Sequence, residues 1–170
     1  MSFLLDFFKV IKMFSMTVLV LLGLFLPINH VEAKTPPEIR NQDELKITQD
    51  MHGQDLNGYE FIKLDLRGFN FSNANLQGAI FNNAQLQGAN LQGADLEDAV
   101  AFASNFEKAD LRDTNLKQAL LMESRFSEAL IEGADFTEAV VSRIQQKELC
   151  SIAEGTNSSS GIDTSYSLGC

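Results

Sequence analysis

Residues 89–98 read Ala89-Asn90-Leu91-Gln92-Gly93-Ala94-Asp95-Leu96-Glu97-Asp98, which is one five-residue pattern written twice. A small residue stands two positions before a large apolar residue, and Asn or Asp stands between them. Counted in steps of five from Leu56 to Val141, 17 of the 18 central positions are large and apolar, and Ala101 is the exception. A period of five fits neither an α-helix of 3.6 residues per turn nor a strand that alternates every two residues.

This period predicts a coil that turns a corner every five residues, so that four sides make one turn of about 20 residues. Glycines two positions after the centre, such as Gly68, Gly88 and Gly93, suit tight corners. Successive turns would pair through backbone hydrogen bonds at about 4.8 Å. The large residues would then stack inside as ladders, and a single repeat would not be stable alone.

The repeats resemble the pentapeptide-repeat family, whose pattern is Ala, then Asp or Asn, then Leu or Phe, then two variable residues. The resemblance covers residues 54–143 and implies an all-β fold, a right-handed quadrilateral β-helix. The first coil departs from the pattern because Tyr59, Leu64 and Phe69 occupy the column of small residues. Large residues there predict a wider, capped end. The fold alone does not assign a function.

Residues 1–33 have the parts of a secretory signal peptide. Lys9 and Lys12 precede an uncharged apolar run over 13–27, and Val31 and Ala33 stand at the positions before the expected cleavage site. We therefore expect an exported protein that begins at Lys34. An uncleaved membrane anchor is the alternative, although the run is shorter than the roughly 20 residues that a span needs. Residues 34–53 would form a polar lead-in or N-terminal cap.

Residues 144–170 should close the C-terminal end with a short helix and a tail. Ser142 and Gln145 have the spacing of a helix-start signature. Ile144, Leu149 and Ile152 are expected to face the last coil, and Gly155 is expected to end the helix.

The two cysteines, Cys150 and Cys170, both lie in this tail. Export implies an oxidising compartment, in which two lone cysteines most simply pair. A bridge around a loop of about 20 residues would contribute on the order of 3 kcal/mol. The tail is also similar to the ending of exported pentapeptide-repeat proteins of cyanobacteria and of the chloroplast thylakoid lumen. That resemblance implies the thylakoid lumen or the periplasm of a cyanobacterium.

One face of the predicted coil is apolar on its outside. Steps of 20 group the central residues 61, 81, 101, 121 and 141, and the outward positions beside them carry Ile80, Val100, Phe102, Leu120, Met122 and Val140. An exposed patch of this kind marks an interface for a partner protein or for a second copy. Two alternatives stay open: residues 34–53 or the C-terminal tail cover the face, or the small Ala101 lets Phe102 or Phe106 shift inward.

Composition excludes several other functions. The chain has 13 Lys and Arg against 23 Asp and Glu, a net charge of −10, which argues against nucleic-acid binding. His52 is the one histidine left after the leader, so two cysteines and one histidine cannot build a four-ligand zinc site. No catalytic triad is in reach, and no metal or cofactor is expected. Asp95, Glu97 and Asp98 favour a solvated acidic edge over a cation site.

The sequence therefore predicts a non-enzymatic exported scaffold that presents a rigid face to a protein partner of unknown identity. The alternative from the family resemblance is an acidic rod that mimics duplex DNA and inhibits DNA gyrase. The leader opposes this alternative because gyrase is cytoplasmic. Asn157-Ser158-Ser159 also matches a glycosylation sequon, which is weak evidence on its own.

Overall fold

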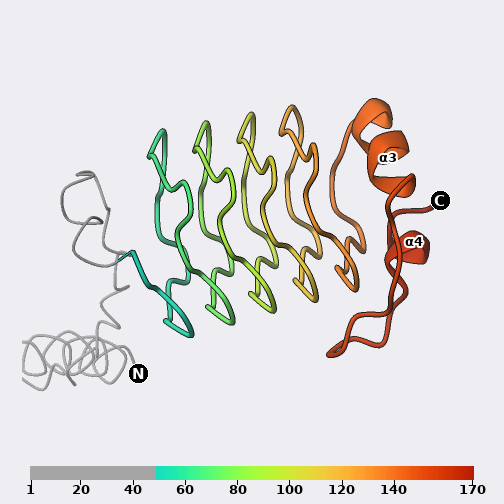
Figure 1. Cartoon of the computed structure of the whole chain (residues 1–170), viewed down its shortest axis with the longest axis horizontal. Coiled ribbons are helices and arrows are strands. Elements are labelled where there is room, and N and C mark those ends of the chain that lie inside the picture. The colour runs from blue at the N-terminus through green and yellow to red at the C-terminus, as the bar shows by residue number, and fades with distance from the viewer. Residues whose placement is uncertain (1–48) are drawn as a thin grey trace, which may run out of the picture. The chain divides into compact units, whose positions relative to one another are not determined.

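The computed structural model describes residues 49–170, and the predicted signal peptide and residues 34–48 lie outside the described part. This part is a right-handed quadrilateral β-helix that is closed at its C-terminal end by a helical cap (Figure 1).

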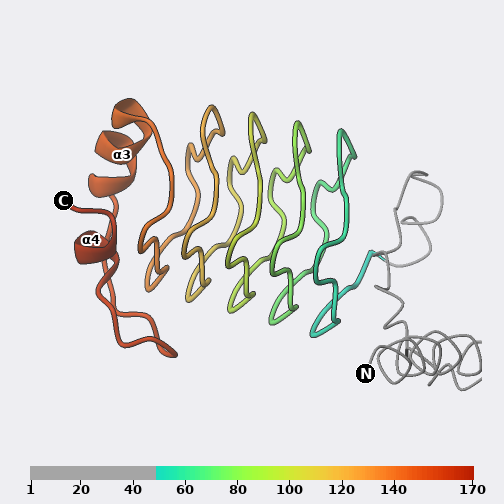
Figure 2. The same cartoon turned by 180° about the vertical axis from the view of Figure 1, so that it is seen from behind.

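Parallel bridges join residues that lie 20 positions apart in successive coils. At one of them the Leu56 N–H donates to the Asn75 carbonyl at 2.7 Å, and the Asn75 N–H donates to the Gln54 carbonyl at 2.9 Å. The coils therefore lie one above another in register, as both side views show (Figures 1 and 2). This register begins at Asp50, and Met51 is buried in the core, so the first coil starts one repeat before residue 54.

The corners are tight turns closed by one backbone hydrogen bond, except at 101–104, where the Ser104 N–H donates to the Ser124 hydroxyl. The Ala74 N–H, for example, donates to the Phe71 carbonyl at 3.0 Å, and Asn73 between them has a φ of +56°. A positive φ at the third position without one at the second matches a type II turn and excludes type I′. Glycine occupies it at several corners, as predicted, and 11 non-glycine residues of the described coils adopt the same conformation. The repeated ladder thus holds the corner geometry even where glycine is absent.

The core is made of the two inward columns. Phe61 and Phe81 stack on adjacent coils with ring centroids 4.8 Å apart, and Ala79 fills the small column beside them with no exposed surface. Burial of each large side chain stabilises the fold by about 1.5–3 kcal/mol. Leu64 and Phe69, the large residues in the small column, are also buried in this core.

Helix α3 (Arg143–Cys150) begins with the predicted capping box. The Ser142 hydroxyl accepts the Gln145 N–H at 3.3 Å, and the Gln145 side-chain oxygen accepts the Ser142 N–H at 2.8 Å. The Gln145 amide also donates to the carbonyls of Leu121 and Ser124, both at 2.8 Å. One side chain therefore caps the helix and also pairs with the edge of the coil beneath it.

Two predictions about this cap are wrong. Ile144 is 74% exposed and Ile152 is 44% exposed, whereas Leu149 is buried. A helix of two turns presents one narrow stripe to the coil, and Gln145 and Leu149 occupy it. Gly155 does not end the helix, which stops at Cys150. Gly155 instead allows the chain to pass close to the last coil.

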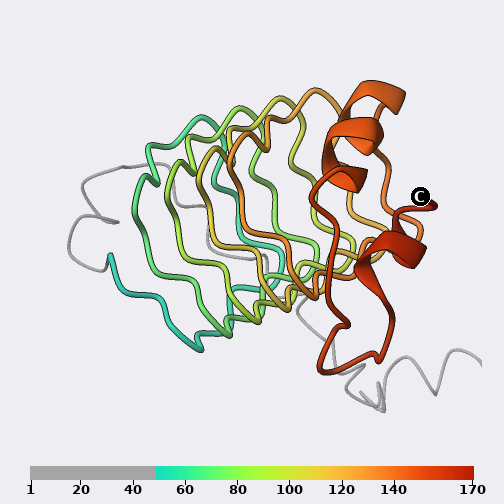
Figure 3. The same ribbon diagram turned by 45° about the vertical axis from the view of Figure 1, so that its right-hand side comes forward.

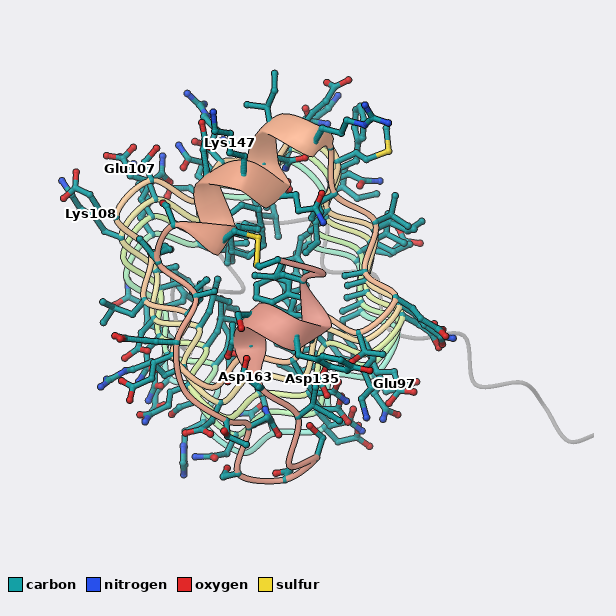
Figure 4. The ribbon with its side chains drawn as sticks, turned by 90° about the vertical axis from the view of Figure 1, so that its right-hand side faces the viewer. Glu97, Glu107, Lys108, Asp135, Lys147 and Asp163 are labelled. Atoms are coloured by element: carbon teal, nitrogen blue, oxygen red, sulfur yellow. A yellow bond between two sulfur atoms is a disulfide. The ribbon has the colours of Figure 1, made fainter. Side chains whose placement is uncertain are left out.

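The remaining tail crosses the end of the β-helix and finishes in α4 (Thr164–Ser167), whose N-cap is Asp163 (Figures 3 and 4). Leu168 is buried, and the Ser167 hydroxyl accepts the Phe136 N–H at 3.0 Å. Neither described helix has the length and apolar character to cross a membrane.

Candidate interaction face

The apolar face, defined as Ile62, Ile80, Val100, Phe102, Leu120, Met122 and Val140, lies on one side of the coil stack. Bridges from Ile80 to Val100, from Val100 to Leu120 and from Leu120 to Val140 place these four residues on successive rungs. A rung spacing of about 4.8 Å therefore makes one continuous aliphatic ladder. The ladder is built by the same register that forms the core.

The face is open to solvent among the described residues. Leu120 and Met122 are each 44% exposed, Phe102 and Val140 are each 40% exposed, and Ile80 and Val100 are half-buried. Ile62, which the sequence interpretation left out, is 42% exposed and extends the face to the first coil. Ile62 directly follows the central residue Phe61, just as Phe102 and Met122 follow their central residues, and this shared position could have identified it from the sequence.

The suggestion that Phe102 or Phe106 shifts into the space beside Ala101 is wrong for Phe102. Phe102 points outward, and its N–H donates to the Asn82 side-chain oxygen at 3.0 Å. Phe106 is buried in its own central position. Two buried serines line the interior here: the Ser124 hydroxyl donates to the Ala101 carbonyl, and the Ser104 N–H donates to the Ser124 hydroxyl at 2.9 Å.

The C-terminal tail does not cover the apolar face. It packs against other sides of the last coils, where the Asn157 amide donates to the Asp113 and Gly133 carbonyls at 3.2 and 2.8 Å. The other candidate cover, residues 34–48, lies outside the described residues.

A different side of the coil is a ladder of alternating acids and amides. The Asn75 amide donates to Asp55 at 2.9 Å, and the Asn115 amide donates to Asp95 at 2.8 Å. Glu97 also accepts from Asn115, at 3.2 Å. Amide donors therefore occupy these carboxylates, and no group of three or more potential metal ligands occurs within residues 49–170. The carboxylates act in the structure as rungs of the ladder.

Charged pairs reinforce the outer surface elsewhere. Hydrogen bonds from Arg112 hold the pKa of Asp110 below its usual range, and Arg67 does the same for Asp65. Ion pairs at the surface contribute little to stability because water and salt screen them. The two pairs orient side chains on the corners and leave the apolar face uncharged.

Asp135 is a fully buried carboxylate at the last coil. Burial raises its pKa, but hydrogen bonds from the Thr137 N–H and hydroxyl and the Lys117 ammonium 3.6 Å away outweigh burial and lower the pKa overall. The ionised Asp135 therefore helps to join the last coil to Lys117 of the coil before it.

His52 has a structural partner. Its Nδ1 lies 2.9 Å from the Ser72 hydroxyl, which donates to the Asn70 side-chain oxygen at 2.7 Å. Because the hydroxyl proton is directed to Asn70, this arrangement links neighbouring coils and does not activate Ser72 as a nucleophile.

The tail is tied to the cap by its two cysteines. The Sγ atoms of Cys150 and Cys170 are 2.07 Å apart, and the bond is visible in the axial view between α3 and α4 (Figure 4). Asn157 is 3% exposed, and its side-chain oxygen accepts the N–H groups of Ser159 and Ser160 at 3.0 and 2.8 Å. The sequon asparagine is therefore a buried structural residue in the folded chain.

Taken together, the 20-residue coils, type II corners and two-column core define a β-helical solenoid of five-residue repeats. The sequence model of one protein family, described as "Pentapeptide repeats (8 copies)", matches residues 60–98, 79–118 and 104–143. The chain belongs to the pentapeptide-repeat family.

The chain is similar to several solved structures, of which the first two have TM-scores above 0.5. The pentapeptide repeat protein Rfr23 from the cyanobacterium Cyanothece 51142 is 26% identical with a TM-score of 0.53, and the match covers 55% of this chain and 64% of that chain. A pentapeptide repeat protein from Nostoc PCC 7120 is 25% identical with a TM-score of 0.52, over 64% and 89% of the two chains. One from the Arabidopsis thaliana thylakoid lumen is 33% identical with a TM-score of 0.39, over 76% and 93%. Curated protein sequences give no significant match.

Proposed function

We propose that this chain is a non-enzymatic, exported scaffold that binds a partner protein through its apolar face. The observation that carries the proposal is the uninterrupted ladder of aliphatic side chains on a side where a solvated coil would carry polar residues. Such patches on soluble proteins mark interaction sites. The coil backbone holds the ladder rigid, so binding orders few additional side chains.

Export is supported by the signal-peptide pattern of residues 1–33 and by the pairing of Cys150 with Cys170. The proposed compartment is the thylakoid lumen or the periplasm. Fractionation of the native protein followed by N-terminal sequencing tests this part. A chain that begins at Lys34 in the lumenal or periplasmic fraction supports it, and a full-length chain in the cytoplasm contradicts it.

The interaction face is tested by placing charge on it. Val100→Asp with Leu120→Asp puts two carboxylates on adjacent rungs of the ladder, where a partner would have to desolvate both. We expect the variant to fold and to lose association with its partner or with itself, measured by the mass of the native complex in sedimentation. Asn73→Asp with Gln92→Asp is the matched control, because it adds the same charge at exposed positions outside the face. Equal association of both variants would refute the proposal.

A further inference from the structure

The last coil contains a stretch of backbone edge that the cap leaves unpaired. One coil earlier, the Leu111 N–H donates to the Leu130 carbonyl at 2.8 Å, and the Leu130 N–H donates to the Ala109 carbonyl at 3.0 Å. The equivalent groups of the last coil are the Ala129 carbonyl and the Ile131 N–H. No group within residues 49–170 hydrogen-bonds to either of them.

The same holds for the preceding corner, where the N–H groups of Phe126 and Glu128 have no acceptor among the described residues. The cap closes the edge on both sides of this stretch. The Gln145 amide donates to the Ser124 carbonyl before it, and the Gly133 N–H donates to the Glu154 carbonyl at 2.9 Å after it. Residues 126–131 therefore form an open segment within an edge that the cap covers elsewhere.

Two cavities lie over this open segment. One of about 360 Å³ is lined by residues 128–132 together with Arg112, Ile152 and Glu154. The other, of about 220 Å³, lies between residues 126–128 and the end of α3. Both cavities are lined by Glu128 and Ile152, so we call them together the end groove.

The side chains of the end groove combine apolar surface with negative charge. Leu130 is 50% exposed and Ile152 is 44% exposed. The exposed acids around them are Glu128, Glu132, Glu148 and Glu154. Arg112 is held by Asp110, and Lys108 forms an exposed ion pair with Glu128 at 3.8 Å, so that within residues 49–170 Glu132, Glu148 and Glu154 carry the unpaired negative charge of the groove. The groove therefore keeps an excess of negative charge beside an aliphatic floor.

We propose that the end groove binds an extended segment of another protein that carries basic residues two positions before and two positions after an aliphatic residue. The aliphatic residue donates its N–H to the Ala129 carbonyl and accepts the Ile131 N–H, as the next coil would. Its side chain then lies on Leu130. Strand addition of this kind takes affinity from backbone hydrogen bonds and specificity from alternate side chains.

The spacing of the groove acids sets the charge pattern of the segment. Glu128 and Glu132 stand two positions before and two positions after Leu130. Both glutamates stand at the corners that bound this side of the coil, so a segment whose aliphatic residue pairs with Leu130 directs its two basic residues toward them. Opposite charges steer association and fix the register of the added strand.

The end groove is a different surface from the apolar face, so the two proposals fail independently. The apolar face follows the central residues from 61 to 141, whereas the groove lies at the capped end over residues 126–132. Val100→Asp with Leu120→Asp should leave binding in the groove unchanged.

The test uses the disulfide-bonded protein and the synthetic peptide acetyl-Lys-Ala-Val-Ala-Lys-amide, with binding followed by NMR titration. We expect a saturable shift of the Ile131 N–H and slower exchange of its proton. A peptide N-methylated at valine cannot donate to the Ala129 carbonyl and should bind about fivefold more weakly. Glu128→Gln with Glu132→Gln should weaken the parent peptide about fivefold at low salt. Asp98→Asn with Glu123→Gln, the control of equal charge, should not change binding.

Three results would overturn the proposal. Equal binding of the methylated and parent peptides would show attraction by charge without strand addition. Protection of the Ile131 N–H in the free monomer would show that this chain covers its own edge. Protection that appears only as protein concentration rises, with a dimer in sedimentation, would make a second copy the occupant.

Discussion

Asn157→Asp tests whether the tail is held to the β-helix by one buried amide. In the structure the Asn157 amide donates to the Asp113 and Gly133 carbonyls and, at 3.5 Å, to the Thr114 carbonyl, and its oxygen accepts two N–H groups. The substitution keeps the shape and the acceptor but places a carboxylate oxygen against the carbonyls of Asp113 and Gly133. Loss of two donated bonds costs about 2 kcal/mol, and the unpaired buried charge brings the total to about 3–5 kcal/mol at pH 7.

The pH dependence separates this cause from a general loss of packing. Burial beside two carbonyls raises the folded-state pKa of the new carboxyl above its unfolded value of about 3.9. The protonated acid can donate one hydrogen bond, so its stabilisation is fully present below pH 3.9 and is lost as the pH rises through the raised pKa. The variant should therefore approach the wild type in acid and fall away from it toward neutrality.

The assay is denaturant unfolding between pH 3 and pH 8, with amide exchange of Ser159 and Gly133 as the local readout. Asn83→Asp is the matched control. Asn83 is exposed at a corner with a φ of +58°, so this substitution makes the same chemical change on a side chain that water surrounds. The reasoning is refuted if Asn157→Asp lies within about 1 kcal/mol of the wild type at pH 7, or if both variants share one pH profile.

Three further predictions concern the cap. Asp135→Asn should lower the free energy of unfolding by about 2 kcal/mol at pH 7 and flatten its dependence on acid pH. The folded-state pKa of Asp135 is lowered, so its stabilisation is present above the unfolded pKa of about 3.9 and is lost as the pH falls through the folded-state pKa. Denaturant unfolding at pH 7 and pH 3 measures this. Cys170→Ser should cost about 3 kcal/mol and speed amide exchange in the tail while the coils stay protected; equally fast exchange throughout would contradict it. Gly155→Ala should cost about 2–4 kcal/mol and Gly161→Ala about 1 kcal/mol in thermal unfolding. Both glycines have a positive φ, but only a Cβ at position 155 would meet backbone, 2.9 Å from the Gly133 nitrogen. Equal losses of stability would contradict this close approach.

The coils could be predicted from the sequence because each of their features repeats. The five-residue period identifies the inward columns, and steps of 20 identify which residues share a side. The exposure of Phe102 and of Leu120 follows from this counting alone. These predictions depend on no tertiary contact other than the stacking of successive coils, which the repeat itself produces.

The cap could be predicted only where a local rule applies. The capping box of Ser142 and Gln145 has a fixed spacing, and the structure contains it. The direction in which Ile144 points depends on how a short helix docks on the last coil, and the buried position of Asn157 depends on carbonyls more than 20 residues away. No repeat or spacing encodes these tertiary contacts, so sequence reasoning could not supply them.

Photocrosslinking in the native compartment tests the proposed interaction face most directly. A photoreactive phenylalanine analogue is placed at Phe102, which is 40% exposed on the apolar face, or at the exposed control position Gln92. The proposal predicts one discrete crosslinked species from position 102 and none from position 92. The same yield from both positions, or no product from position 102, would contradict it.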